Sequence, residues 1–171
     1  MEIFSELKKQ AEEVRFKYIQ KGNPNRRKLI GNVAIGKLEI SNGNIYQQEA
    51  TSKKEPMDRP VEKPEALTGK GGKPYTGPKQ YFAPYPDEDH PDQPLNDTHA
   101  EYKVFNALAD ILESAGLPEE TEGILYLYTE REMCSGCTQV SLDFQTFFNR
   151  KFNNIELKVQ WTRKYRKRDD S

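Results

Sequence analysis

Two short motifs carry residues whose types and spacing suit metal chemistry. His99 and Glu101 form a His-x-Glu motif, and Cys134 and Cys137 form a Cys-x-x-Cys motif. One imidazole and two thiolates make three soft ligands. Zinc prefers four-coordinate nitrogen and sulfur sites, and a catalytic zinc site keeps its fourth position for water. The ligand count therefore predicts an open zinc site rather than a closed structural one.

Glu101 is too close in sequence to His99 to serve as a fourth ligand, and it suits proton transfer instead. Zinc lowers the pKa of a bound water from about 15.7 to about 7. A neighbouring carboxylate can take a proton from that water and return it to a leaving amine. Each motif also follows a loop and opens a predicted helix, whose N-terminus would stabilise thiolates.

Other interpretations of these motifs stay open. A strand followed by Cys-x-x-Cys and a helix also builds a thioredoxin-like redox site, in which Cys134 would be the attacking thiolate and His99 incidental. A closed structural zinc site could form if His90 supplied a fourth ligand. Glu101 on its own would be read as a solvated helix residue. The joint presence of both motifs favours zinc.

Composition narrows the class of protein. The 171 residues carry a net charge of −1 with two cysteines and two histidines, which predicts one domain over residues 1–171 without a disulfide framework. No apolar run reaches membrane-spanning length. The charged start lacks the apolar middle of a signal peptide. We therefore expect a soluble chain with no membrane contact, and the near-neutral charge argues against a uniformly basic DNA-binding domain.

The first half of the chain predicts a helix, a hairpin and a long loop. Residues 2–20 place apolar side chains at helical spacing, so a helix is expected within residues 1–22. Residues 32–40 and 44–51 read as strands, and Asn42-Gly43 between them predicts a hairpin over residues 31–51. Nine prolines lie in residues 53–96, where no periodicity survives, so we expect a Pro-rich loop insertion.

The second half alternates helices and strands around the two motifs. A helix is expected from Asp97, capped by Asp97 or Thr98 and ended by Gly116. Residues 123–129 read as a buried central strand, 140–152 as a second helix and 155–161 as a strand. The order predicts an α/β fold with a mixed sheet flanked by helices, where both helix N-termini converge at one end of the sheet.

The residues around the motifs resemble a known superfamily. The stretches HAEYKVFNALAD, GILYLYTEREMCSGCTQVSLDFQTFF and NIELKV are similar to the cytidine-deaminase-like proteins, whose zinc enzymes carry H-x-E and a later P-C-x-x-C. Within this superfamily, these residues most resemble the deaminase domains at the C-termini of bacterial polymorphic toxins. The resemblance covers residues 97–159 closely and residues 31–51 loosely.

The resemblance implies a fold and an active site. It implies a three-layer cytidine-deaminase-like fold with a mixed sheet of about four to five strands, although only four strands are evident. It implies a catalytic core over residues 97–161, with zinc on His99, Cys134 and Cys137 and with Glu101 as the proton shuttle. One departure is that Met133 stands where the family usually has proline, which would alter the local backbone or the floor of the pocket.

The resemblance also implies hydrolytic deamination of cytosine in DNA or RNA, and we favour single-stranded DNA because the base must leave the stack to reach the zinc. It implies a toxin domain that is secreted within a larger protein, acts in the target-cell cytoplasm and is bound by a cognate immunity protein. We expect a monomer. Adenine, a free nucleoside or nucleotide, and a non-catalytic zinc-stabilised binding module stay open as alternatives.

Further candidate residues could contact the substrate. At strand ends, in the loop and beside the first cysteine, they are Asn32, Thr51, Ser52, Tyr81, Phe82, Tyr85, Met133 and Ser135. The loop aromatics could stack on a base, at about 1–3 kcal/mol each, or could instead fasten the loop to the core. Asn32 could equally serve turn chemistry.

Two basic clusters could follow a phosphate backbone. One lies in the basic tail over residues 162–171 and comprises Arg163, Lys164, Arg166, Lys167 and Arg168. The other is Arg26-Arg27-Lys28, just before the predicted hairpin. The alternative is that both clusters are simply solvated.

Overall fold

The computed structural model describes residues 2–25, 31–52, 81–83, 85, 88 and 99–163. These residues form a four-stranded sheet with the strand order β2-β1-β3-β4. The hairpin strands β1 (Val33–Ile40) and β2 (Ile45–Thr51) are antiparallel, and β1 also pairs antiparallel with β3 (Glu122–Arg131). Strand β4 (Asn154–Arg163) runs parallel to β3. The expected mixed sheet is confirmed, with the hairpin at one side and the parallel pair at the other.

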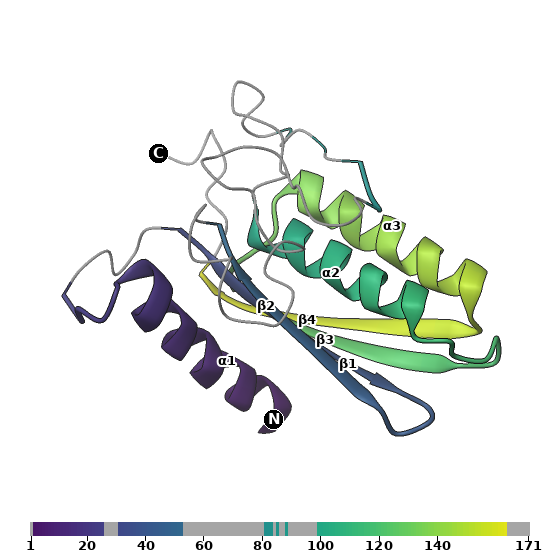
Figure 1. Cartoon of the computed structure of the whole chain (residues 1–171). Helices are drawn as coiled ribbons and strands as arrows, with labels where there is room; N and C mark the ends of the chain where they lie inside the picture. Colours follow the sequence, from purple (N-terminus) through teal and green to yellow (C-terminus); the bar gives the residue numbers. More distant parts are fainter. Residues whose placement is uncertain are drawn as a thin grey trace.

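Helices cover both faces of the sheet, which gives the expected three layers. Helix α1 (Glu2–Val14) lies on one face, and α2 (Ala100–Ser114) and α3 (Ser135–Lys151) lie side by side on the other (Figure 1). A turn of π-helix, η1 (Arg15–Ile19), follows α1 directly. No helix in the described part of the chain has the length and hydrophobicity needed to cross a bilayer.

Strand β3 is central because both of its faces are covered. Leu125 and Leu127 pack into the larger core beneath α2 and α3, whereas Tyr128 packs into a smaller core beneath α1. Such double burial explains why residues 123–129 are nearly all apolar. The α2 layer approaches β1 closely, since a Cβ atom built at Gly36 would lie 2.8 Å from a methyl carbon of Val104.

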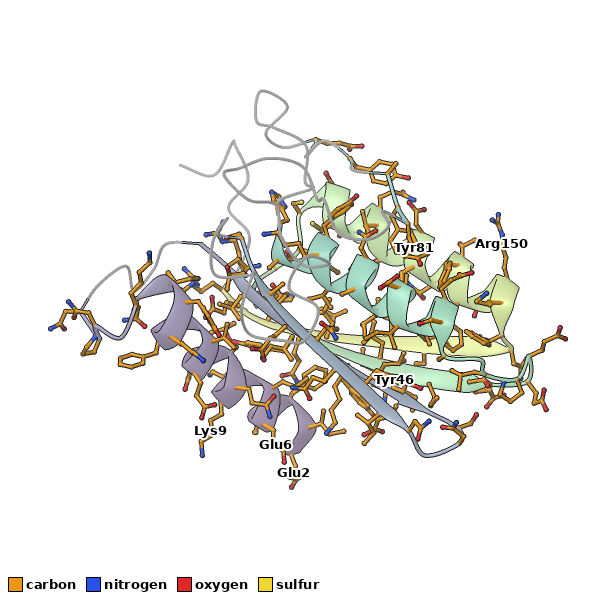
Figure 2. All side chains as sticks on the ribbon, in the orientation of Figure 1. Glu2, Glu6, Lys9, Tyr46, Tyr81 and Arg150 are labelled. Atoms are coloured by element: carbon orange, nitrogen blue, oxygen red, sulfur yellow. The ribbon has the colours of Figure 1, made fainter. Side chains whose placement is uncertain are left out.

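The N-terminal helix is amphipathic, as its spacing predicts. Leu7, Ala11 and Val14 are buried against the sheet, whereas Glu2, Glu6 and Lys9 point away from it (Figure 2). The sequence predicts one helix over residues 2–20, but the last turn widens into π-helix from Arg15 onward. Single π-turns inside helices are rare and often occur at functional sites.

The helix that carries the His-x-Glu motif begins later than expected. Asp97 and Thr98 lie outside the described residues, and α2 starts at Ala100. His99 has an extended backbone (φ −71°, ψ 147°), so it precedes the first helical residue and occupies the N-cap position. The predicted end is confirmed, because Gly116 adopts the left-handed φ of +69° that helix termini favour.

Candidate metal centre

Three ligand atoms converge at the N-termini of the two neighbouring helices. His99 is the N-cap residue of α2, Cys134 is the N-cap residue of α3, and Cys137 lies in the first turn of α3. The His99 Nδ1 atom lies 3.7 Å from the sulfur of Cys134 and 3.4 Å from that of Cys137. All three ligand atoms lie within 4.8 Å of one another.

These separations between ligand atoms suit an ion with tetrahedral coordination. Zinc bonds of about 2.3 Å to sulfur and about 2.0 Å to nitrogen, at the tetrahedral angle, separate the two ligand atoms by about 3.5 Å. The observed sulfur–nitrogen distances of 3.7 and 3.4 Å lie on either side of that value. His99, Cys134 and Cys137 can therefore hold a metal ion, and the nitrogen–sulfur donor set is one that zinc prefers.

Helix α3 favours the thiolate form of its first cysteine. The backbone N–H of Cys137 donates to the sulfur of Cys134 at 3.4 Å, which is the N-cap interaction of this helix. Hydrogen bonding from the Cys137 side chain, supported by His99, lowers the pKa of Cys134 to about 5 despite the opposing effect of burial. The thiolate is the form that binds metal.

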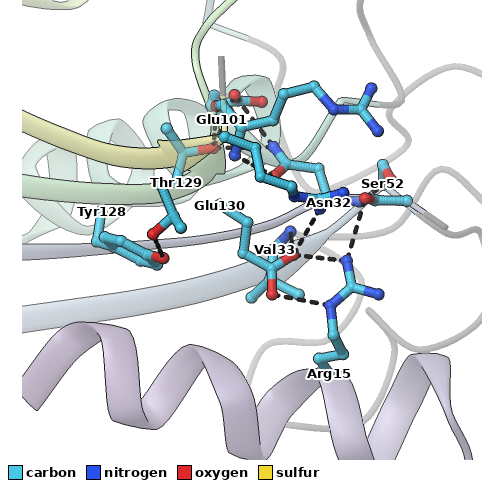
Figure 3. A network of polar contacts seen from close by, with 12 residues as sticks. Arg15, Asn32, Val33, Ser52, Glu101, Tyr128, Thr129 and Glu130 are labelled. Atoms are coloured by element: carbon cyan, nitrogen blue, oxygen red, sulfur yellow. Dashed lines mark hydrogen bonds and ion pairs between the residues drawn. The ribbon is translucent and has the colours of Figure 1, made fainter. Parts of the chain in front are cut away.

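Glu101 lies in the first turn of α2 and is buried, with only 4% of its surface exposed. Its Oε2 atom accepts hydrogen bonds from Asn32 Nδ2 at 3.2 Å and from Thr129 Oγ1 at 3.0 Å (Figure 3). Burial raises the pKa of this carboxyl, while the charge of His99 opposes the rise. Glu101 is therefore a buried, hydrogen-bonded carboxyl rather than a solvated helix residue.

Asn32 links three segments of the chain. Its Nδ2 atom donates to Thr129 Oγ1 at 2.9 Å as well as to Glu101, and its Oδ1 atom accepts the N–H of Arg131 at 3.0 Å. Thr129 Oγ1 also lies 3.0 Å from the carbonyl of Arg131. A hydroxyl carries one proton, so Thr129 can donate either to Glu101 or to that carbonyl at one time. The network can thus accommodate both protonation states of Glu101.

His99, Cys134 and Glu101 border one small cavity of about 160 Å³. It is lined by Asn32, Ser52, His99, Ala100, Glu101, Arg131, Glu132 and Cys134. A cavity of about 150 Å³ accommodates a benzene ring, so this one has room for a single six-membered ring. Two of the predicted substrate contacts, Asn32 and Ser52, are thus brought to the same cavity as Glu101. Thr51 is buried instead, and its carbonyl accepts the Nζ of Lys103.

The predicted loop aromatics are held by polar and core contacts. The hydroxyls of Tyr81 and Tyr85 donate to Asp110 and Asp143, and Phe82 is buried in the larger core. Burial and the bond to Asp110 raise the pKa of Tyr81 to about 12. Tyr81 and Phe82 also line a groove of about 530 Å³ along α3. These contacts fit residues that fasten the loop, and their stacking on a base stays a prediction.

The remaining predicted contacts are scattered. Met133 is half-buried against the larger core, and Ser135 Oγ accepts the N–H of Glu88. Arg163 lies 3.8 Å from Glu130. The residues His90, Arg26, Arg27, Lys28, Lys164, Arg166, Lys167 and Arg168 lie outside the described residues.

Several residues near the cavity were not predicted as functional, and three of them lie toward the ends of β3 and β4. Thr129 ends the apolar strand, Arg131 lines the cavity, and Trp161 is the register partner of Thr129 on β4. Trp161 follows Ile155, Leu157 and Val159 at even spacing, so it lies on the face of the sheet that α2 and α3 cover. Polar or aromatic residues at the carboxyl ends of parallel strands are the signal that could have identified them.

The fold and the site together define an α/β protein in which three residues that could hold a metal ion meet at one end of a mixed sheet. Comparison of the chain with models of known protein families gives no match, and comparison with curated proteins gives none either. The site geometry and the sequence resemblance therefore carry the functional argument.

Proposed function

We propose that this chain is a zinc-dependent deaminase that converts cytosine to uracil in single-stranded DNA. The observation that carries the proposal is the placement of Glu101: a buried carboxylate, tethered by Asn32 and Thr129, borders the same ring-sized cavity as His99 and Cys134. A redox site built on Cys-x-x-Cys has no need of the His99 nitrogen beside both sulfurs. A closed structural site has no need of the cavity.

The reaction replaces the amino group of cytosine by oxygen. Zinc held by His99, Cys134 and Cys137 would supply a water acidified to a pKa of about 7. Glu101 would carry one proton from the attacking water to the ring nitrogen as the C4–O bond forms, and then carry the proton of the new C4 hydroxyl to the amino group as the C4–N bond breaks and the carbonyl forms. Water and cytosine are consumed, and uracil and ammonia are released. Asn32 and Thr129 hold Glu101 Oε2 throughout these transfers.

A polymeric substrate is supported by residues around the cavity. Arg131 lines it, and the arginine fork suits recognition of phosphate. Trp161 is 42% exposed and lies beside Thr129 on the neighbouring strand, where a base of a single strand can stack. The size of the cavity favours a pyrimidine over a purine. Delivery as a toxin domain, with an immunity protein as partner, rests on the resemblance of residues 97–159.

Deamination of mixed oligonucleotides, read by sequencing, tests the proposal. We expect C-to-U conversion in single-stranded DNA by the zinc-loaded protein and none by the Glu101→Gln variant, which should still bind one zinc ion. Glu156→Gln is the matched control, because Glu156 is an exposed carboxylate of β4, and it should stay active. If the protein binds no zinc and forms a reducible Cys134–Cys137 disulfide, it belongs with redox proteins instead.

A further inference from the structure

A buried ion pair lies on the face of the sheet opposite the metal centre. Arg15 Nε donates to Glu130 Oε2 at 2.8 Å and Arg15 Nη2 donates to Glu130 Oε1 at 2.6 Å. Arg15 is 7% exposed and Glu130 is 8% exposed. The two residues are 115 positions apart, with Arg15 at the start of the π-turn after α1 and Glu130 near the end of β3. The pair therefore ties the N-terminal helix to the strand that carries Thr129 and Arg131.

The same pair holds the backbone on both sides of Asn32 (Figure 3). Arg15 Nη2 donates to the carbonyl of Gly31 at 3.1 Å, and the N–H of Val33 donates to Glu130 Oε1 at 3.1 Å. Ser52 holds Asn32 itself: its Oγ accepts the Asn32 N–H at 2.8 Å, and its N–H donates to the Asn32 carbonyl at 2.9 Å. Each residue from Gly31 to Val33 thus has a backbone group held by a hydrogen bond with Arg15, Ser52 or Glu130.

The fixed peptide directs the Asn32 side chain toward the proton shuttle. The side-chain amide of Asn32 donates to Glu101 and Thr129, and it accepts the N–H of Arg131. Glu130 lies between Thr129 and Arg131 in the chain, so the ion pair also fixes the segment that supplies two of these three partners. Displacing the ion pair would shift the donors that hold Glu101 Oε2.

We propose that Arg15 is a positioning residue for Glu101, acting from the opposite face of the sheet through Glu130 and Asn32. The inference rests on the proposed deaminase function. Arg15 is not among the described residues that line the cavity, so its proposed role is to position other residues and not to take part in the chemistry itself. Its role depends on the arginine fork, because a lysine ammonium is a point charge that cannot make two parallel bonds to the carboxylate while also reaching Gly31.

A purely structural role makes a different prediction from a positioning role. A buried ion pair is weak evidence for stability, since apolar residues of similar volume often replace such pairs without loss. The matched control is Leu7→Ala, because Leu7 is also a buried residue of the N-terminal helix packed on this face of the sheet. It lowers the stability of the α1 layer but leaves the bonds around Asn32 in place.

The test compares Arg15→Lys with Leu7→Ala in the zinc-loaded full chain, below the unfolding temperature of both variants. For Arg15→Lys we expect kcat to fall about 10- to 100-fold, as for loss of other orienting contacts. We expect KM within about twofold of wild type, one zinc ion per chain, and faster amide hydrogen exchange at Val33 and Arg131. For Leu7→Ala we expect kcat and these two amides to stay as in the wild type.

Equal kcat and equal exchange at Val33 and Arg131 in the two variants would overturn the positioning role. Glu130→Gln provides a second variant if Arg15→Lys does not fold. The glutamine amide keeps an acceptor for the Val33 N–H but weakens the bond to Arg15. The values of kcat and of amide exchange are then compared with those of Leu7→Ala in the same way. If the wild type deaminates no substrate, the proposed function fails. In that case the exchange measurement alone decides whether Arg15 holds Asn32 and Glu101 in place.

Discussion

Cys134 performs two roles that one substitution can separate. Its sulfur is one of the three atoms that could hold a metal ion, and it also caps α3 by accepting the N–H of Cys137. Cys134→Ser keeps a capping oxygen but removes the thiolate, whereas Cys134→Ala removes both. We therefore expect the two variants to lose zinc equally and to differ in the stability of the metal-free protein.

The magnitudes follow from the two roles. Replacing a good N-cap residue by alanine costs about 1 kcal/mol, so metal-free Cys134→Ala should be less stable than Cys134→Ser by about that amount. Zinc at 100 times its dissociation constant stabilises a folded protein by about 2.7 kcal/mol. For a chain of this length each kcal/mol shifts Tm by about 2–4 °C. The Tm of the wild-type protein should therefore rise by about 5–11 °C on zinc addition. The Tm of both variants should stay almost unchanged.

Thermal unfolding with and without a chelator, together with zinc content by elemental analysis, measures both quantities. His99→Ala serves as a parallel variant, because it removes a ligand without touching the cap of α3. The assignment of the ligands would be refuted by a Cys134→Ser protein that binds one zinc ion with wild-type affinity. A wild-type protein whose Tm is unchanged by the chelator would refute the link between metal binding and folding.

Other substitutions test the packing and the proposed nucleic-acid face. Gly36→Ala should lower the free energy of unfolding by about 1–3 kcal/mol, because its new methyl group would meet Val104 at 2.8 Å, and denaturant titration should show a smaller loss for Gly123→Ala, whose closest contact is 3.2 Å. Phe82→Ala should cost about 3–5 kcal/mol as a core truncation, and a loss of oligonucleotide binding at unchanged stability would instead identify Phe82 as a stacking residue. Trp161 is the single tryptophan, so its fluorescence should change on titration with single-stranded DNA, and Trp161→Ala should weaken binding by about 1–3 kcal/mol; a flat titration would remove Trp161 from the interface.

The sequence predicts the architecture well because each element carries its own signal. The alternation of residues 32–40, the Asn42-Gly43 turn and the apolar run of residues 123–129 each depend on local physics, and the structure confirms the three strands. The convergence of His99 with the two cysteines also followed from topology, since helices after parallel strands open at the same edge. What was wrong was the start of α2, where the backbone of His99 is extended.

The supporting network could not be predicted, because its members are distant in sequence and ordinary in type. Arg15 reads as a polar position of an amphipathic helix, yet it is buried against Glu130 on the far side of the sheet. Thr129 and Glu130 look like the end of a strand. Only the register of β1 on β3, which pairs Ala34 with Thr129, brings them beside Asn32. Register across so long a separation leaves no local pattern in the sequence.

The pairing of β1 with β3 also has a consequence for folding kinetics. The metal ligands lie at most 38 positions apart, within the unit of α2, β3 and α3. The bonds that hold Glu101 also need Asn32, the residue directly before β1. Asn32 lies 69 positions from Glu101 and 97 positions from Thr129 in the sequence. Contacts between distant segments form slowly because loop closure costs entropy before they stabilise the chain. We therefore expect a refolding chain to acquire zinc first and catalytic competence later, when the hairpin docks onto β3.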